Sequence, residues 1–231
     1  MQFSSFSDKA FLKVLYYLLK ELWRGASVTR ALMNLSLIGI SLEGDVLDAG
    51  AKDKHRTYYN YIDIQRAEIN FCDLYSQDNS ILRINFENEI DIPDNSYNII
   101  LLFNVLEHIF NHKLLLSELS RITKLNGRLI GFVPFQFPYH PDPSDFYRYT
   151  HICITRLLLG SGFKSVVVEL VGVGDLIQLC EVLGRLLLHP FFRILRVGLI
   201  LILFSASMLL SNFSTNNKCF SYLGIKFIAT K

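Results

Sequence analysis

The sequence predicts an α/β protein whose core is a doubly wound, mostly parallel sheet. Two observations support this prediction. Short apolar runs end in a polar or glycine residue, as buried parallel strands do before a tight turn, and segments with helical periodicity separate several of them. Strands that alternate with helices form such a sheet, and ligands bind it at the carboxyl ends of the strands.

Residues 1–43 are expected to form an amino-terminal helical cap. Apolar residues recur at helical spacing from Ser7, a plausible N-cap, to Gly25, which ends the first helix, and a second helical stretch covers about 28–37. We expect this cap to lie over the core or over a substrate cleft. The first residues lack a basic stretch and a small-residue cleavage site, so we expect no signal peptide.

The core is expected to comprise residues 44–175 and 218–231. Between its strands we expect helices at 105–125, closed by Asn126 and Gly127, and at 152–159. Polar residues follow three of the predicted strands, namely Asp48, Asp63 and Asn104. The expected strands are 46–47, 59–62, 99–103, 128–133, 164–170 and 222–229.

Residues 176–217 are expected to be an apolar helical insertion before the last strand. The run 197–210 has no charged residue, but it is shorter than the roughly 20 residues that a membrane-spanning helix needs. Arg185, Arg193 and Arg196 precede it, as in segments that dip into one leaflet while basic side chains meet headgroups. The sequence thus predicts peripheral contact with the inner face of the cytoplasmic membrane; a helix buried against the sheet and a homodimer interface are the alternatives.

Composition narrows the class of protein further. Hydrophobic residues make up 51% of the 231 residues, which is too much for a disordered chain. Lys and Arg number 23 against 21 Asp and Glu, and this net charge of +2 predicts no nucleic-acid partner. The 4 cysteines are far apart without a C-x-x-C pair, which argues against a zinc knuckle and favours the reducing cytoplasm.

A glycine turn directly follows the first predicted strand, in GDVLDAGA at 44–51. Glycine lets backbone amides approach a ligand where a Cβ would block them, although an ordinary strand-to-helix turn would read the same. The missing G-x-G-x-x-G argues against a dinucleotide-binding dehydrogenase. Asp63 ends the next predicted strand, where its carboxylate can accept both hydroxyls of a ribose; a solvated aspartate is the alternative.

The most specific stretch is IPDNSYNIILLFNVLEHI, at 92–109. Together with the glycine turn it resembles class I S-adenosylmethionine-dependent methyltransferases of the type 11-like group, which have P-D-N-S before a strand and V-L-E-H after it. The resemblance spans about 44–162, and 222–231 is similar to the family's closing strand. It implies a Rossmann-like fold, S-adenosylmethionine as cofactor and methyl transfer as the reaction.

The resemblance also implies which residues contact the cofactor. Two positions depart from the family pattern: Lys52 stands where a second glycine is usual, and Asn85 where an aspartate is usual. A catalytically degenerate, methyltransferase-like binding module in a polysaccharide-synthesis assembly is therefore the alternative. The implied contacts are Asp48 and Gly50 with the methionine part, Asp63 with the ribose, Asn85 and Phe86 with the adenine, and Asn104 beside the sulfonium.

The segment VPFQFPYHPDPSDFYRYT, at 133–150, resembles a loop in a narrower branch of the family associated with O-antigen and other surface polysaccharides. This implies that a hydroxyl of a small or lipid-linked glycan precursor accepts the methyl group, with Tyr147 and Arg148 as substrate contacts. A neutral hydroxyl needs a base, for which His140 oriented by Asp145 is the first candidate and His108 the second.

Each of these loop residues has a simpler interpretation. His108 can cap or pack a helix, and the proline-rich loop can be a rigid lid in which Arg148 is only a salt-bridge partner. His140, Asp142 and Asp145 are also donor types of a hard-metal site. Three ligands on one proline-stiffened loop make a poor cage, so no metal is expected.

Overall fold

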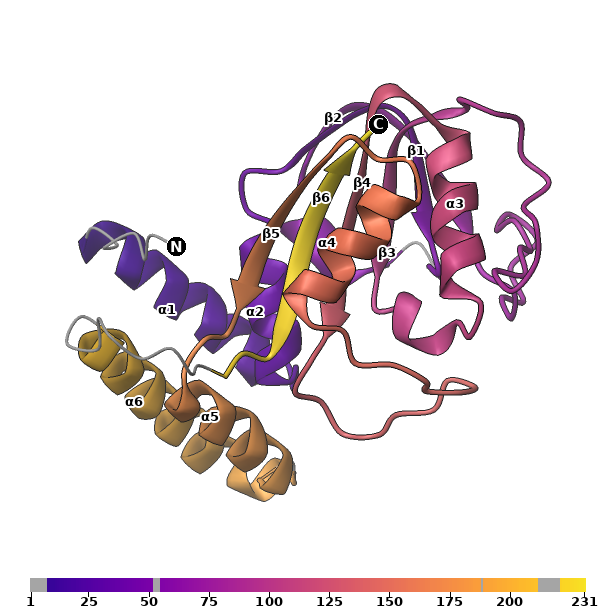
Figure 1. The fold of residues 1–231 in the computed structure, drawn as a ribbon. Coiled ribbons are helices and arrows are strands. Elements are labelled where there is room, and N and C mark those ends of the chain that lie inside the picture. Colours follow the sequence, from indigo (N-terminus) through magenta and orange to yellow (C-terminus); the bar gives the residue numbers. More distant parts are fainter. Residues whose placement is uncertain (1–7, 52–54, 188, 212–220) are drawn as a thin grey trace. The chain divides into compact units, whose positions relative to one another are not determined.

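The computed structural model describes residues 8–51, 55–187, 189–211 and 221–231 (Figure 1). The chain forms two compact units. The helical unit comprises Met1–Ser36 and Val171–Leu223, and the sheet unit comprises Leu37–Leu170 and Gly224–Lys231. The domain boundaries expected from the sequence stay predictions.

Six strands form one sheet in the order β2-β1-β3-β4-β6-β5. β1 pairs in parallel with β2 and β3, β3 pairs in parallel with β4, and β6 is antiparallel to β4. The predicted Rossmann-like, mostly parallel α/β fold is confirmed. The strands are β1 (Ser41–Ala49), β2 (Asp63–Cys72), β3 (Tyr97–Phe103), β4 (Thr123–Pro134), β5 (Ser165–Val171) and β6 (Gly224–Thr230).

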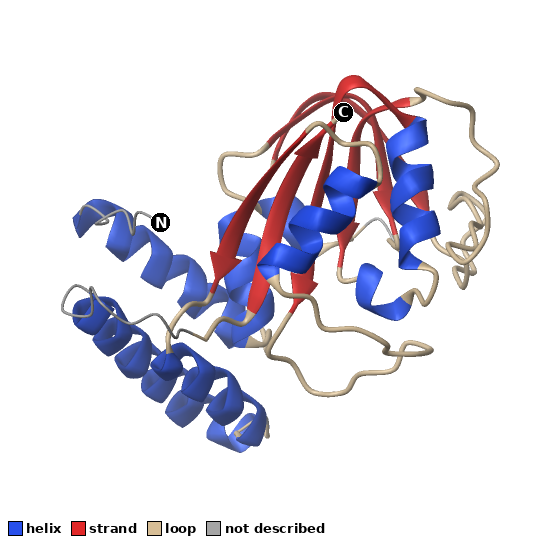
Figure 2. Cartoon of the chain, viewed as in Figure 1, coloured by secondary structure: helices blue, strands red, loops and turns tan. Residues whose placement is uncertain are grey.

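The centre of the sheet is the most apolar part of this unit. β3 reads YNIILLF and is buried at all positions but one, as expected of a strand covered on both faces. Figure 2 shows α3 (His112–Ile122) and α4 (His151–Gly160) over the same face of the sheet. α3 contributes Leu115, Leu116 and Leu119, which are fully buried, to the core beneath it.

The prediction of a strand at 59–62 is wrong. The 3-10 helix η1 (Thr57–Asn60) covers the first half of this range, and β2 starts only at Asp63. The aromatic residues of this segment suggest a strand, but they pack against the core from a turn. Tyr58 is buried, with its ring 4.9 Å from that of Phe103. β2 escaped prediction because it is an edge strand whose first half is exposed and polar.

The predicted helix 105–125 is also shorter than expected. Its first turn is a separate 3-10 helix, η2 (Leu106–His108), and α3 ends at Ile122. Asn126 and Gly127, expected to close the helix, lie within β4. Pairing of Thr123 with Tyr97 begins the strand early, so tertiary pairing overrides the turn signal.

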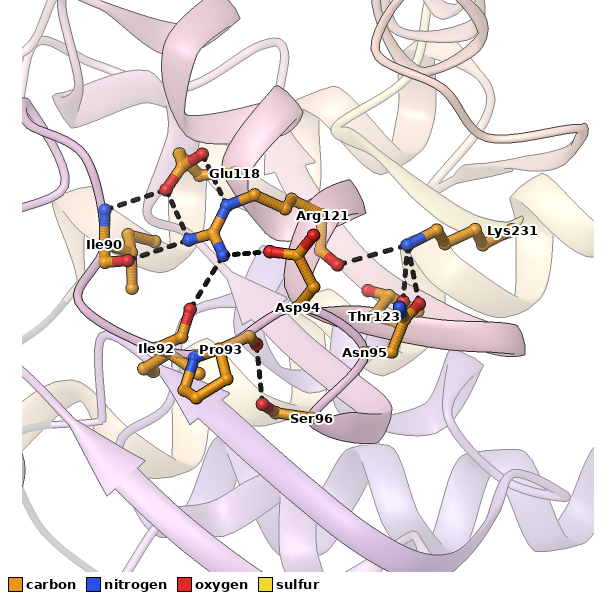
Figure 3. A network of polar contacts seen from close by, with 10 residues as sticks. All are labelled: Ile90, Ile92, Pro93, Asp94, Asn95, Ser96, Glu118, Arg121, Thr123 and Lys231. Carbon is orange, nitrogen blue, oxygen red and sulfur yellow. Dashed lines mark hydrogen bonds and ion pairs between the residues drawn. The ribbon is translucent and has the colours of Figure 1, made fainter.

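The P-D-N-S segment has a structural role in the sheet unit (Figure 3). Lys231 Nζ donates to Asn95 Oδ1 and to the carbonyl oxygens of Arg121 and Thr123. Hydrogen bonds from Arg121 also hold the pKa of the Glu118 carboxyl below its usual value. The loop is thereby fixed to the end of α3, because the Arg121 guanidinium donates to the carbonyl oxygens of Ile90 and Ile92 and to the carboxylates of Asp94 and Glu118.

Buried polar contacts tie the helices of the helical unit together. The backbone amide and hydroxyl of Thr29 donate to Glu181 Oε2 at 2.8 and 3.1 Å, and Asn34 Nδ2 donates to Glu21 Oε2 at 3.0 Å. Arg196 donates to the carbonyl oxygen of Leu22. These bonds connect α1 (Asp8–Trp23), α2 (Val28–Ser36), α5 (Asp175–Leu186) and α6 (Arg193–Ser211).

The region expected to be an apolar helical insertion is helical. It consists of α5, the 3-10 helix η3 (Pro190–Phe192) and α6. Within the described residues, no helix combines the length and the hydropathy needed to cross a bilayer. The expected N-cap Ser7 lies outside the described residues.

Candidate active site

The loops that follow β1, β2, β3 and β4 start at one edge of the sheet. Ala49, at the end of β1, pairs with Cys72 and with Leu102, next to the ends of β2 and β3. The backbone amide of Asn104 donates to the carbonyl oxygen of Phe132 at 2.9 Å, which joins this edge to β4. In a parallel α/β sheet this carboxyl edge is where ligands bind.

The turn after β1 depends on the absence of a side chain at Gly50. Its φ is +87°, and a Cβ built there would lie 2.3 Å from Val105 Cγ2. The Gly50 amide donates to the carbonyl oxygen of Cys72, and Arg56 donates to the carbonyl oxygen of Gly50. The glycine therefore lets the turn touch the first residue of the V-L-E-H segment. Lys52, a departure from the family pattern, lies outside the described residues.

Asp48 is buried beneath two tyrosines. Its Oδ2 accepts hydrogen bonds from the hydroxyls of Tyr58 at 2.5 Å and Tyr59 at 2.6 Å. Burial raises the pKa of the Asp48 carboxyl, although these two hydrogen bonds and the charge of Arg56 act in the opposite direction. In this arrangement the carboxylate positions the tyrosines, so a direct contact between Asp48 and a cofactor stays a prediction.

The acid expected to bind the ribose lies at the opposite edge of the sheet. Asp63 is the first residue of β2, pairs with Ser41 at the start of β1 and is exposed. The expectation that Asp63 ends a strand is therefore wrong, and with it the geometric reason for placing the ribose there.

Asp73 is the acid that follows β2 at the carboxyl edge. It is buried, its amide donates to the carbonyl oxygen of Leu82, and its Oδ1 accepts from the amide of Tyr75 at 2.7 Å. Sequence reasoning missed it, but spacing could have found it. Asp73 follows Gly50 by 23 residues, near the spacing of about 20 between a glycine turn and a ribose-binding acid, whereas Asp63 follows by only 13.

The two residues expected near the adenine lie in the long loop between β2 and β3. Asn85 is exposed and its Oδ1 accepts the amide of Glu87 at 3.0 Å, while Phe86 is buried. Asn85 lines a pocket of about 310 Å³ together with Asn88 and Glu89. The pocket gives Asn85 a place beside a ligand, and contact of either residue with adenine stays a prediction.

The loop after β4 is fastened onto η2 by backbone contacts. The amides of Phe146 and Tyr147 donate to the carbonyl oxygen of Glu107, at 2.9 and 3.3 Å. The Tyr149 hydroxyl donates to the carbonyl oxygen of Leu106 at 3.2 Å. The V-L-E-H segment and the loop therefore form one structural element at the carboxyl edge.

His108 is oriented by this contact. Its Nδ1 lies 2.6 Å from the carbonyl oxygen of Ser144, and because a carbonyl only accepts, we assign the ring proton to Nδ1. In the neutral ring Nε2 is then the acceptor, 3.8 Å from Glu107 Oε1. The imidazole thus has the tautomer and the fixed orientation of a general base.

His140 and Asp145 do not form the expected dyad. Asp145 instead accepts the backbone amide of His140 at 2.7 Å and is bound bidentately by the guanidinium of Arg148. Hydrogen bonds from Arg148 hold the pKa of the Asp145 carboxyl below its usual value. The structure therefore gives His108 the oriented geometry that was expected of His140.

Arg148 and Tyr147 both support the loop. Besides Asp145, Arg148 donates to the carbonyl oxygens of Phe137, Pro138 and Tyr147, which matches the salt-bridge interpretation. The rings of Phe110, Phe146 and Tyr147 pack against one another in an aromatic cluster, and Phe110 is 65% exposed. Over the part of the chain that the structure describes, no three His, Cys, Asp or Glu residues gather as metal ligands.

Comparison with known protein families gives a match over part of the chain. Residues 41–131 match the family model described as methyltransferase domain, a range that includes the glycine turn, Asp73, Asn104 and His108. No curated protein sequence matches the chain.

Solved structures similar to the chain share its fold at low identity. An Archaeoglobus fulgidus SAM-dependent methyltransferase has a TM-score of 0.53 and 16% identity over 94% of this chain and 99% of its own. The [4+2]-cyclase SpnF has a TM-score of 0.53 and 14% identity over 96% and 94%. Haemonchus contortus phosphoethanolamine N-methyltransferase 2, solved with S-adenosyl-L-methionine, has a TM-score of 0.50 and 17% identity over 100% of this chain and 60% of its own.

The chain therefore shares its fold with solved SAM-dependent methyltransferases, and the match to the methyltransferase domain model covers its residues 41–131.

Proposed function

We propose that the protein transfers the methyl group of S-adenosylmethionine to a hydroxyl of a small cyclic acceptor, such as a surface-glycan precursor. The observation that carries this proposal is the placement of the glycine turn, a buried acid and an oriented imidazole at one sheet edge: Gly50, Asp73 and His108. A cofactor with a ribose and a reaction that removes a proton require these groups.

The residues at the carboxyl edge fit the cofactor in their chemistry. Asp73 offers a carboxylate, which can accept both ribose hydroxyls, and Asn104 follows β3 with a φ of +54° in the same edge. The bound cofactor supplies an electrophilic methyl group on a sulfonium. Asp48 acts through Tyr58 and Tyr59, whose hydroxyls it holds.

His108 is the proposed base. Nε2 takes the proton of the acceptor hydroxyl as the oxygen attacks the methyl group, and the carbonyl oxygen of Ser144 holds the proton on Nδ1. The carboxylate of Glu107 lies 3.8 Å from Nε2. His140 keeps no such orientation and is not needed as the base.

The aromatic cluster suits an acceptor with an apolar ring face. Phe110 follows His108 by two residues, and Phe146 lies on the loop that is bonded to Glu107, so both exposed rings provide flat apolar surface on the segments that hold the base. The likeness of 133–150 to loops of the surface-polysaccharide branch supports a glycan precursor, free or lipid-linked. A lipid-linked acceptor would place the protein at the inner face of the cytoplasmic membrane.

A methyltransferase-like binding module without turnover is the second candidate. Asn85 favours it, because the amide oxygen expected to face the adenine is already bonded to the amide of Glu87. The similarity to a [4+2]-cyclase also fits a fold that serves several functions.

Two measurements separate these functions. Calorimetric titration with S-adenosylhomocysteine, with NADH as the control, should give binding to the first ligand alone. Methyl-labelled S-adenosylmethionine should then label a neutral glycan acceptor with the wild type but not with His108→Gln. Binding without labelling of any acceptor would favour the binding module, and binding of NADH alone would overturn both.

A further inference from the structure

The first helix presents apolar side chains to solvent. α1 buries Leu18 and Leu22 among the other helices of its unit, yet a second stripe at helical spacing is exposed. This stripe consists of Leu12, Tyr16, Leu19 and Trp23. Lys13, Lys20 and Arg24 each follow a member of the stripe by one position and thus lie along one side of it. An exposed apolar stripe bordered by basic residues is the pattern of a helix that lies in a membrane interface.

The turn between α5 and α6 is a second exposed apolar surface in the same unit. Phe191 is 82% exposed, Ile194 77% and Leu186 73%, and Phe192 and Leu195 are also exposed. The guanidinium of Arg193 lies 5.8 Å from the ring centre of Trp23, so the turn adjoins the end of the α1 stripe. We call these two sets together the apolar end of the helical unit. Patches of this kind on a water-soluble surface mark binding sites.

The exposed charged residues described beside Trp23 and in the turn between α5 and α6 are basic. Glu181 is the last acidic residue of the sequence, and both it and Glu21 are buried. Arg193 and Lys13 are exposed, and Arg24 is half exposed beside Trp23 with one guanidinium nitrogen 3.4 Å from Glu21 Oε1. An anionic surface matches this arrangement, because phosphate groups can meet the arginines while the apolar side chains leave water.

We propose that the apolar end docks on a bilayer with anionic headgroups, with Trp23, Phe191 and Ile194 entering the interface. A second copy of this chain is a poorer occupant. In a symmetric dimer the same patch meets itself, so Arg193 would face its own copy, and the described residues of the turn offer no exposed acid to offset it. The proposal names the surface that would contact the membrane and the lipid headgroups it would bind, at the peripheral location suggested above. It does not depend on methyl transfer.

The exposure of the side chains in the apolar insertion decides which substitutions can test membrane docking. Within the run 197–210, Ile200 and Phe204 are buried, and Leu199 and Leu203 are half-buried against the rest of the unit. Serine at these positions would weaken folding as well as any docking. Phe191 and Ile194 are the better positions, because their exposed side chains contribute little to the stability of the folded protein.

The experiment is vesicle flotation of the full chain without cofactor or acceptor. Vesicles of phosphatidylcholine with phosphatidylglycerol are compared with vesicles of phosphatidylcholine alone. The wild type should float with the anionic vesicles, less so at high salt, and Phe191→Ser/Ile194→Ser should bind at least about tenfold more weakly. Leu159→Ser/Val167→Ser, which changes two exposed apolar residues of the sheet unit, is the matched control and should float like the wild type.

Thermal unfolding and S-adenosylhomocysteine binding of the variants confirm that each is folded. Equal flotation of Phe191→Ser/Ile194→Ser and wild type, or no flotation of the wild type, would overturn the proposal. So would a wild-type dimer that stays off vesicles and that Phe191→Ser/Ile194→Ser converts to a monomer, since the patch would then be an interface between copies. Failure of methyl transfer leaves these readouts unchanged and bears only on the proposed function.

Discussion

The turn after β1 and the loop after β4 lie at the same edge of the sheet but are held in different ways. Backbone geometry fixes the turn, since Gly50 has a positive φ and touches Val105. Side chains fix the loop, through the contact of His108 with Ser144 and the bonds of Arg148 to Asp145. We therefore predict that the proposed cofactor half and the proposed acceptor half of the site can be disrupted separately.

The largest expected effect is on the acceptor half alone. His108→Gln should lower the methylation rate by about 10²–10⁴-fold, because it removes the proposed base. Its affinity for S-adenosylhomocysteine should stay within about twofold of wild type. Single-turnover rates and calorimetry measure the two quantities.

His140→Ala is the matched control for this prediction. Both rings lie in the same loop region, with centroids 6.4 Å apart, but only His108 is held by Ser144. The control should keep near-normal turnover. A large loss in His140→Ala with little loss in His108→Gln would return the role of base to His140.

A substitution at Gly50 should disrupt the proposed cofactor half of the site. Gly50→Ala introduces a Cβ at 2.3 Å from Val105 Cγ2 on a backbone with a φ of +87°. We expect it to lower the free energy of unfolding by about 1–3 kcal/mol and to weaken S-adenosylhomocysteine binding at least about tenfold. Gly160→Ala, where a Cβ would meet no atom within 4 Å, should behave like the wild type. Wild-type stability and affinity in Gly50→Ala would contradict this account of the turn.

A smaller effect is expected from the salt bridge that stiffens the loop. Asp145→Asn should lower the free energy of unfolding by about 2 kcal/mol at pH 7, since it removes a charged hydrogen-bond partner of Arg148. Arg148 holds the pKa of Asp145 below its usual value, so this stability is present above pH of about 4 and is lost as the pH falls through the lowered pKa. Denaturant unfolding of both proteins should therefore converge in acid. A difference that persists unchanged at pH of about 2 would argue against the ion pair as its source.

The central strands and the V-L-E-H segment could be predicted because their signals are local. β3 is a continuous apolar run, and it ends at a residue with a positive φ, Asn104. β2 could not be found in the same way, because an edge strand with exposed polar residues has little apolar periodicity. Because of this error, the predicted ribose acid was Asp63, which begins β2, and Asp73 at the carboxyl edge was overlooked.

The acceptor loop shows a second limit. The sequence brings His140 and Asp145 close along the chain, but the carboxylate pairs with Arg148 only three residues away. Whether the Asp145 carboxylate pairs with His140 or with Arg148 depends on how the loop folds back on η2. The sequence pattern of the loop does not predict that conformation. His108 was recognised as a candidate, whereas its orientation by the Ser144 carbonyl is a long-range contact.

The most direct test of the carboxyl-edge site compares the aspartates at the two ends of β2, Asp63 at its start and Asp73 directly after it. Asp73→Asn and Asp63→Asn remove the same charge at opposite edges of the sheet, and thermal unfolding of both variants controls for the burial of Asp73. Titration with S-adenosylhomocysteine should show affinity reduced about 10–100-fold by Asp73→Asn, the loss of a charged hydrogen-bond acceptor, and unchanged by Asp63→Asn. Loss of affinity in Asp63→Asn with wild-type affinity in Asp73→Asn would contradict the account.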